Sequence, residues 1–421
     1  MMQPNSRRSP SYQTGFTLVE LMVGLAIGML ATLVIVQVIS VFEAQSRSTR
    51  GSADAQTNGG IAMYTIAHDM QLAGYPLMST SNGAPLGCTT LTIDGAADVP
   101  NGTTDVTNRL SPVVITDGIV GTGANASPSD AITIRYGDTA MGGVPTQTMG
   151  VLPDPLNPTT VGVKNTFGCQ VPNPVAAYAT LPVMALITSG TSCYMSTVTT
   201  VQYVDPTVPR PQPNPPPETM TLANVPTVVN PGVNLACLGT WHEVTYRVND
   251  GNLERCDLPQ AVAAGGNCDP TAFPNANFVP SVVGIVNLQA QYGISDGTLP
   301  SSSPNYNRII RWVDATGVWS APTVANRNRI KAVRIAVVAR NAKLETSAVT
   351  SACSSTTLAN PTGLCAWDAT SALPTPPLAP PFVASPAPTI DLSASNSQWL
   401  QYRYRVFNTI IPLRNVIWTK D

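Results

Sequence analysis

An uncharged apolar run near the N-terminus constrains this chain more than any other feature. It covers residues 21–42, LMVGLAIGMLATLVIVQVISVF. A helix of this length rises about 33 Å, enough to cross a hydrocarbon core of about 30 Å. A secretory signal has a shorter apolar segment of about 7–15 residues. No second run of this kind follows, so the sequence predicts a chain that crosses a membrane once at most.

The composition predicts a globular body with long uncharged loops. Charged residues make up 11% of the chain, against about 25% in an average soluble domain. The 22 Lys and Arg residues nearly balance the 24 Asp and Glu residues. Because there is no surplus of positive charge to bind phosphates, no nucleic acid is expected as a partner. With 43% hydrophobic residues and a net charge of -2, the chain does not have the composition of a disordered protein.

The start of the apolar run carries a short motif. Residues 15–20 read GFTLVE, behind a polar leader, residues 1–15, that contains Arg7 and Arg8 but no acid. This junction resembles the GFTLxE signature of type IV prepilins. The resemblance implies that a prepilin peptidase cuts after Gly15 and methylates the new amine of Phe16. Glu20 would then be the fifth residue of the mature chain.

Glu20 is the only ionisable residue between positions 16 and 42. A charge inside a membrane helix costs a few kcal/mol, so it usually has a partner or a function. The expected partner is the amine that cleavage creates at Phe16, presented by a neighbouring subunit of a fibre. Opposite charges about 4 Å apart attract by about 4 kcal/mol at an effective dielectric near 20, before desolvation is subtracted. The alternative is that Glu20 lies at the headgroup level of a plain anchor helix.

The residues after the membrane run predict a longer helix and then strands. Residues 43–75 form its polar half, with a weak point at Gly59 and Gly60 and an end at residues 74–76, Gly-Tyr-Pro. Its apolar stripe, at three- to four-residue spacing, is Met63, Ile66, Ala67, Met70 and Ala73. Strands are expected at residues 113–116, 131–136, 183–188, 197–204, 242–248, 282–292, 330–340 and 402–413.

This order of elements predicts an α+β fold, in which a long N-terminal helix, membrane-spanning in its first half, packs on an antiparallel β-sheet. Residues 249–252 predict a hairpin turn. The Pro-rich stretches 206–217 and 374–388 predict extended loops or spacers. The expected divisions are a leader, 1–15; a transmembrane and pilus-core helix, 16–42; its polar half, 43–75; and a periplasmic β-rich domain, 76–421.

Several downstream segments add to the resemblance. They are SPVVITDG (111–118), SDAITIRYGD (129–138), VVGIVNLQAQYGI (282–294), IKAVRIAVVAR (330–340) and RYRVFNTIIPLRN (403–415). Together with the leader they resemble PilW-type minor pilins, and they reach both ends of the chain. The Pro-rich stretches have no counterpart in that resemblance.

Eight cysteines follow the membrane run, and an even number in an exported segment predicts disulfides in an oxidising periplasm. Close spacing favours Cys256 with Cys268 and Cys353 with Cys365, and suggests Cys169 with Cys193. Eight cysteines allow 105 connectivities, so other pairings stay open. The spacings do not match those of a zinc site, and no metal is expected.

The sequence offers little for catalysis. It contains only two histidines, His68 and His242, and no nucleophile elbow, phosphate loop, HExxH or EF-hand motif. Glu243 follows His242 in an expected strand, where adjacent side chains point to opposite faces, so it cannot orient the imidazole. We therefore expect no enzyme, no catalytic residue and no cofactor.

The sequence favours a minor pilin that takes part in type IV pilus assembly, in an initiation or tip complex. The expected partners are prepilin peptidase, other minor pilins, the major pilin and the inner membrane. The protein would be single-pass in the inner membrane of a Gram-negative bacterium, with a periplasmic C-terminal domain, and would then enter the pilus. Two alternatives stay open: a J-type pseudopilin of type II secretion, and a membrane-anchored adhesin or binding ectodomain.

Overall fold

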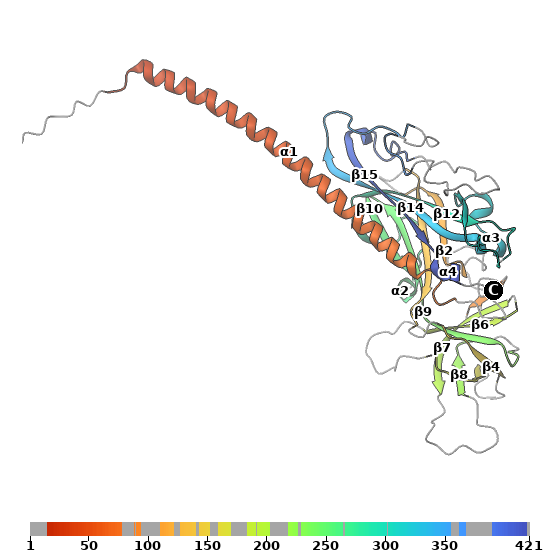
Figure 1. The fold of residues 1–421 in the computed structure, drawn as a ribbon. Helices are drawn as coiled ribbons and strands as arrows, with labels where there is room; N and C mark the ends of the chain where they lie inside the picture. The colour runs from red at the N-terminus through yellow and green to blue at the C-terminus, as the bar shows by residue number, and fades with distance from the viewer. Residues whose placement is uncertain are drawn as a thin grey trace, which may run out of the picture. The chain divides into compact units, whose positions relative to one another are not determined.

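The computed structural model of the chain is shown in Figure 1. The structure describes residues 15–77, 88, 90–93, 110–121, 127–139, 143–151, 159–169, 183–190, 192–202, 218–225, 229–263, 266–300, 302–354, 362–367 and 390–418. The leader before Gly15 and both Pro-rich stretches lie outside these residues. The chain divides into two compact units, Met1–Ala53 and Asp54–Asp421.

Helix α1 spans Leu18–Leu72 and contains 55 residues. No proline occurs between positions 11 and 75, so no backbone N–H is missing from its hydrogen-bond ladder. The helix also continues through Gly59 and Gly60, where a weak point was expected. It ends before Gly74, which has a φ of 77° that favours glycine. The Gly74 N–H donates to the carbonyl of Arg135 at 2.8 Å, which ties the helix end to a strand.

The described residues of the unit Asp54–Asp421 form two sheets, and the larger has eleven strands. Its strands are β1 (Thr90–Ile93), β2 (Val113–Ile119), β3 (Ser129–Gly137), β4 (Thr146–Val151), β5 (Thr160–Val163), β6 (Val183–Ser189), β7 (Ser192–Gln202), β8 (Glu218–Leu222), β9 (Asn234–Asn249), β10 (Asn252–Asp257) and β11 (Val279–Val283). Their main order is β1-β7-β8-β5-β4-β9-β10-β11, while β6 pairs with β7 and β9, and β3 pairs with β2 and β9.

Strand β9 connects the two regions of this sheet. Its first half pairs with β6, and its second half pairs with β3 and β10. Gly239 lies where the pairing changes, with a φ of 74°. A Cβ there would lie 2.2 Å from Asp138 Oδ1, so only glycine fits without a shift. The strand expected at residues 242–248 is therefore only the second half of a 16-residue strand.

The smaller sheet is antiparallel, with the order β13-β12-β14-β15. Its strands are β12 (Ile285–Ser295), β13 (Ile309–Val313), β14 (Ile330–Leu344) and β15 (Tyr402–Pro412), and short helices α2 (Leu258–Ala263), α3 (Val324–Arg329) and α4 (Arg414–Trp418) accompany the sheets. The single strand expected at residues 282–292 is wrong. Gly284, with a φ of 79°, divides that segment between β11 in one sheet and β12 in the other.

The second half of α1 packs on the sheets and completes the main core. Ala62, Ile66 and Met70 are fully buried in one cluster with residues of β12 and β14. A second cluster, around β5 to β9, contains Val161, Met220 and Leu235. The expected α+β fold with an N-terminal helix is confirmed. The expectation missed β1, β4, β5, β8, β10 and β13, which have six residues or fewer, too few for an alternating pattern to stand out.

Candidate functional site

The N-terminal junction is built around a capped helix start. Thr17 precedes the first residue of α1, and the Glu20 N–H donates to Thr17 Oγ1 at 3.2 Å. In return, Glu20 Oε2 accepts from the Thr17 N–H at 3.3 Å and from the Thr17 hydroxyl at 3.2 Å. This reciprocal pattern is a capping box, and it places the carboxylate in the first helical turn, where the helix dipole favours a negative charge.

The expected cleavage residues lie immediately before this cap. A Cβ on Gly15 would meet no atom within 4 Å, and the side chain of Phe16 is 87% exposed. The structure thus places Gly15, Phe16 and Glu20 in one short, accessible stretch. The cleavage, the methylation and the pairing of Glu20 with an amine stay predictions. Thr17 was missed as a functional residue, although the T-x-x-E spacing would have revealed it.

The first part of α1 is apolar on every side. Residues Leu18–Glu43 form a 26-residue stretch with a mean hydropathy of 2.5, and none of it is buried. Among the described residues this is the one helix long and apolar enough to cross a membrane. Exposed aliphatic side chains all round a helix require lipid or other helices as neighbours. The segment therefore suits both a bilayer and the interior of a helical fibre.

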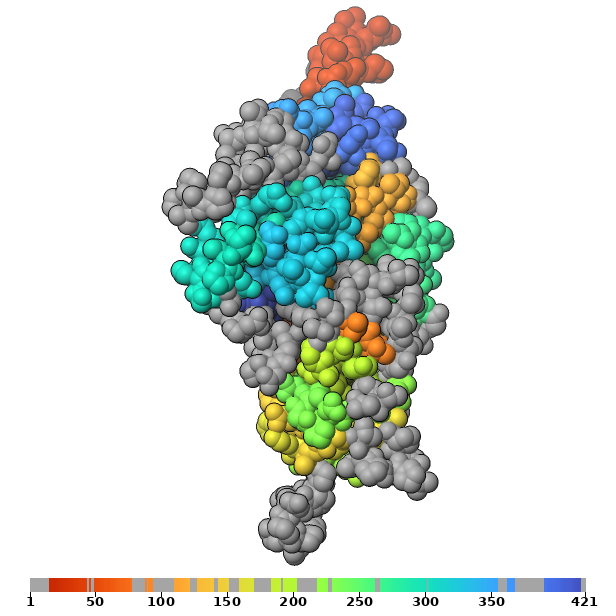
Figure 2. Space-filling model, turned by 90° about the vertical axis from the view of Figure 1, so that its right-hand side faces the viewer, coloured from red at the N-terminus to blue at the C-terminus, as the bar shows by residue number. Residues whose placement is uncertain are grey.

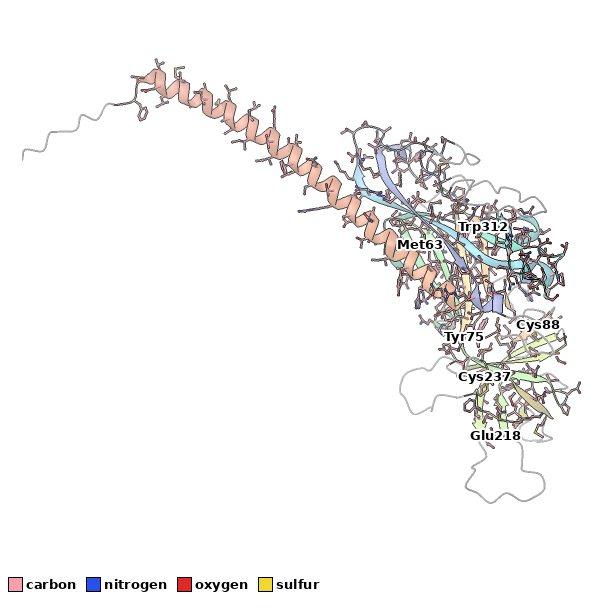
Figure 3. The ribbon with its side chains drawn as sticks, in the orientation of Figure 1. Met63, Tyr75, Cys88, Glu218, Cys237 and Trp312 are labelled. Carbon is pink, nitrogen blue, oxygen red and sulfur yellow. A yellow bond between two sulfur atoms is a disulfide. The ribbon has the colours of Figure 1, made fainter. Side chains whose placement is uncertain are left out.

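The second part of α1 is docked through a narrow stripe. Ile66, Met70 and Ala73 are buried as expected, and Met63 and Ala67 are partly buried against the same cluster (Figure 3). Ala55, Gly59 and Ala62 extend the stripe towards the start of the unit. At Gly59 the ring of Phe407 from β15 lies so close that an added Cβ would be 2.0 Å from its Cε2. Glycine here allows the helix backbone to contact the strand.

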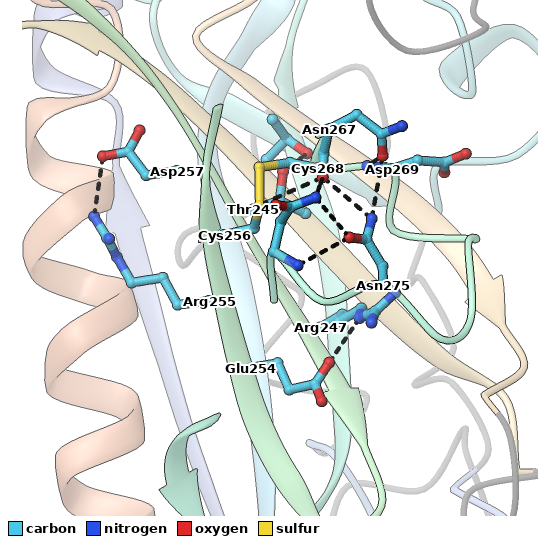
Figure 4. Close-up of a disulfide and its surroundings, with 12 residues drawn as sticks. Thr245, Arg247, Glu254, Arg255, Cys256, Asp257, Asn267, Cys268, Asp269 and Asn275 are labelled. Atoms are coloured by element: carbon cyan, nitrogen blue, oxygen red, sulfur yellow. Dashed lines mark hydrogen bonds and ion pairs between the residues drawn. A yellow bond between two sulfur atoms is a disulfide. The ribbon is translucent and has the colours of Figure 1, made fainter. Parts of the chain in front are cut away.

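A polar contact between helix and sheet lies beside this stripe. Asp69 Oδ2 accepts from the hydroxyl of Tyr246 at 2.7 Å, and Arg255 Nη2 lies 3.6 Å from the same oxygen. Arg255 also lies 3.8 Å from Asp257, on the side of β10 that faces α1 (Figure 4). Burial, followed by the charge of Asp69, raises the pKa of Tyr246. Tyr246 therefore stays a neutral donor to Asp69.

His242 belongs to this network of strand contacts. Its Nδ1 lies 2.9 Å from Asp257, its Nε2 lies 3.6 Å from Asp138, and its ring stacks on Tyr136 with 5.1 Å between centroids. Burial would lower the pKa of His242, but the two carboxylates outweigh it and raise the pKa above its ordinary value. These contacts connect β3, β9 and β10, so His242 has a structural role.

Glu243 points away from His242, as the strand alternation predicted. It accepts two hydrogen bonds from the Arg135 guanidinium, at 2.9 and 3.1 Å, and both side chains are buried. The other histidine, His68, has a side chain that is 58% exposed and lies 3.3 Å from Asp69. Within the described part of the chain, no group of three or more His, Cys, Asp or Glu side chains could hold a metal.

All eight cysteines are joined in four disulfides. Cys256–Cys268 (Figure 4) and Cys353–Cys365 link residues 12 apart, the two pairs that the close spacing favoured. The disulfides enclose short loops beside the larger and the smaller sheet. Complete pairing fits a chain that folds in an oxidising compartment.

The suggested bridge between Cys169 and Cys193 is wrong. Cys169 is joined to Cys237 in β9, and Cys193 in β7 is joined to Cys88 (Figure 3). The reason lies in the strand order: β1 runs parallel to β7 and brings residue 88 to Cys193, at a sequence separation of 105. Spacing along the chain does not reveal that pairing.

Comparison with known protein families gives two matches. Residues 266–415 match the family of type IV pilus-assembly protein W, PilW. Residues 10–36 match the prokaryotic N-terminal methylation motif. No curated protein and no solved structure matches the chain significantly.

The two matches fall on the two features described above. The first covers β11 and the whole smaller sheet, and the second covers the capped junction and the start of the apolar helix. Both families consist of structural pilus proteins. The chain therefore carries a PilW-type region behind a prepilin-type N-terminus, and the two matches support anchoring in the inner membrane and a part in type IV pilus assembly.

Proposed function

We propose that this protein is a minor pilin of the complex that starts or caps the pilus. In this proposal prepilin peptidase removes residues 1–15, residues 16–42 first cross the membrane and later enter the fibre core, residues 43–75 form the polar half of the helix, and residues 76–421 form the periplasmic domain. The partners are the peptidase, other minor pilins and the major pilin. The observation that carries the proposal is the capped Glu20 at the start of a helix, followed by residues 21–42, which expose only apolar or uncharged polar surface before Glu43.

The helix makes transfer from bilayer to fibre energetically feasible. Its side chains between residues 18 and 43 are exposed, and burial of apolar area is worth about 25 cal/mol per Å² wherever water is excluded. Lipid and a bundle of like helices both exclude water. The apolar surface therefore gives little preference between them, and the polar groups decide where the subunit is held.

Glu20 is the polar group that distinguishes the two environments. In the isolated subunit, the Thr17 N–H and hydroxyl satisfy one carboxylate oxygen, which reduces the cost of keeping the acid in lipid. Cleavage after Gly15 would add a positive charge at Phe16. An adjacent subunit then supplies a charged donor for the second oxygen. The attraction is about 4 kcal/mol before desolvation, and it favours assembly by the amount that exceeds the cost of desolvating the two charges.

The first experiment determines the mature N-terminus. The protein is isolated from cells with and without prepilin peptidase and analysed by mass spectrometry of its N-terminal peptide. We expect a methylated Phe16 in the first case and residue 1 in the second. An intact leader in peptidase-positive cells, or a start near residue 44, would refute the proposal.

The second experiment tests Glu20 by a matched series. Glu20→Val should leave processing intact but reduce incorporation into sheared pili, because no charge meets the neighbouring amine. Thr17→Ser retains the hydroxyl and should resemble the wild type. Thr17→Val removes the hydroxyl but leaves the charge of Glu20 in place, so it distinguishes an effect of the helix cap from an effect of the charge. Normal incorporation of Glu20→Val would contradict the pairing.

A deletion strain tests the system in which the protein acts. Loss of surface pili and twitching motility, with enzyme secretion intact, is the expected result. Loss of enzyme secretion with normal pili would instead assign the protein to a type II secretion system as a pseudopilin.

A further inference from the structure

A polar groove opens beside the smaller sheet. It lies between the end of β12, the loop that follows it and helix α3, and its volume is about 640 Å³. The segment from residue 296 to residue 329 reaches the surface on the face shown in Figure 2. A volume of this size is within the range of small-molecule sites.

The polar side chains of the groove are held by defined contacts. Asp296 accepts from the N–H and the hydroxyl of Thr298, at 2.9 and 2.7 Å. Arg329 donates from Nε to the carbonyl of Ser295 at 3.0 Å and from Nη1 to Asn326 Oδ1 at 3.4 Å. These contacts fix the carboxylate and the guanidinium before any ligand arrives, which lowers the entropy cost of binding.

An aromatic ring and a second amide complete the lining. Tyr306 and Asn328 line the groove and are half-buried. The ammonium of Lys331, itself buried, lies 4.8 Å from the centre of the Tyr306 ring and restrains it. The groove thus combines a flat apolar ring, amide groups that both donate and accept, a carboxylate and a guanidinium.

Among the residues that line the groove, the charges balance. It has one acid, Asp296, and one base, Arg329. The pKa of Asp296 lies below its ordinary value, first because of the two hydrogen bonds from Thr298 and also because of the charge of Arg329. The carboxylate is therefore ionised, and its charge offsets that of the guanidinium. A strongly anionic ligand would meet Asp296, and a cationic ligand would meet Arg329.

We infer that this groove binds a neutral sugar of an oligosaccharide. Sugar hydroxyls donate and accept in alternation, as the amides of Asn326 and Asn328 do, and a carboxylate and a guanidinium supply one fixed acceptor and one fixed donor. The C–H face of a pyranose fits against the ring of Tyr306. This site goes beyond the proposed role in pilus assembly and does not depend on it.

The test uses the full chain in a zwitterionic detergent, because detergents with sugar headgroups would compete. The chain is applied to an array of neutral and sialylated oligosaccharides, and the strongest ligand is then titrated by calorimetry. We expect a neutral oligosaccharide to bind. Asn328→Ala should weaken its binding by about tenfold, as the loss of one or two hydrogen bonds predicts.

Two further variants make the result specific to the groove. Ala325 is exposed on α3 and lines the groove, so Ala325→Trp should block it without disturbing the core. Gln260 is an exposed amide that lines a different groove of about 520 Å³, so Gln260→Ala should bind normally. The inference is overturned if no neutral oligosaccharide binds, if only sialylated ones bind, or if Ala325→Trp binds as well as the wild type. Pili and N-terminal processing should be normal in all three variants, which separates this test from those above.

Discussion

The contact between α1 and β15 gives a sharp prediction, because two adjacent glycines differ only in their surroundings. A Cβ at Gly59 would lie 2.0, 2.4 and 2.8 Å from three ring carbons of Phe407. Carbon atoms normally approach to about 3.5–4.0 Å, so the ring or the helix must move by more than 1 Å. A Cβ at Gly60 would meet nothing within 4 Å. The same Gly→Ala substitution can therefore be made at two adjacent positions of one helix, one where the new methyl group clashes and one where it does not.

The magnitudes follow from two opposing effects. Alanine stabilises the interior of a helix by about 1 kcal/mol relative to glycine, and both variants have that gain. Inserting a methyl group into a packed contact costs about 1–3 kcal/mol, and only Gly59→Ala has that cost. Gly60→Ala should therefore raise the free energy of unfolding by up to about 1 kcal/mol. Gly59→Ala should be less stable than Gly60→Ala by about 1–3 kcal/mol.

The measurement is guanidinium unfolding of the detergent-solubilised chain with its disulfides intact, followed by tryptophan fluorescence. Trp312, Trp319, Trp367 and Trp399 are buried in the unit Asp54–Asp421 and report on it. A double variant, Gly59→Ala with Phe407→Leu, should recover part of the loss, because a smaller side chain makes room for the methyl group. Equal stability of Gly59→Ala and Gly60→Ala would show that the helix does not contact β15 as described.

Two further predictions concern buried charges. Glu243→Ala leaves the Arg135 guanidinium buried without its carboxylate and should lower the free energy of unfolding by about 3–5 kcal/mol. The control Arg403→Ala breaks a surface pair with Glu345 and should leave the free energy of unfolding almost unchanged. Equal losses of the two variants in chemical denaturation would contradict this prediction. Burial raises the pKa of Asp130 from 3.8 to about 7, so its contribution to stability is present at low pH and is lost as the pH rises from about 4 to about 7. Asp130→Asn should flatten that part of the stability profile, and an unchanged slope would refute the assignment.

The features of the N-terminal helix could be predicted from the sequence because their causes are local. The apolar run, Glu20 and the stripe of α1 depend on residues within one or two helical turns of each other. The two 12-residue disulfide loops are local in the same sense. The strands β3 and β14 could also be found, because their β-branched, largely apolar residues lie within the strand itself.

The pairing of distant segments could not be predicted. The contact of Asp69 with Tyr246 spans 177 residues, and the Cys88–Cys193 disulfide spans 105. The sequence around either residue of such a pair does not indicate which distant residue it contacts. The short strands β4, β5 and β8 could not be predicted either, because they are stable only through the strands beside them.

The order of residues was enough to predict one helix long and apolar enough to cross a membrane, a prepilin-type junction before it and a single acid near its start. Those properties depend on the order of neighbouring residues and on the exclusion of charge from lipid. The folded chain was needed to show that β9 is shared between two regions of the sheet, that Gly59 contacts Phe407 and that Asp296 and Arg329 line one groove. Such contacts form only when the whole chain folds and buries its apolar surface, so no local stretch of sequence predicts them.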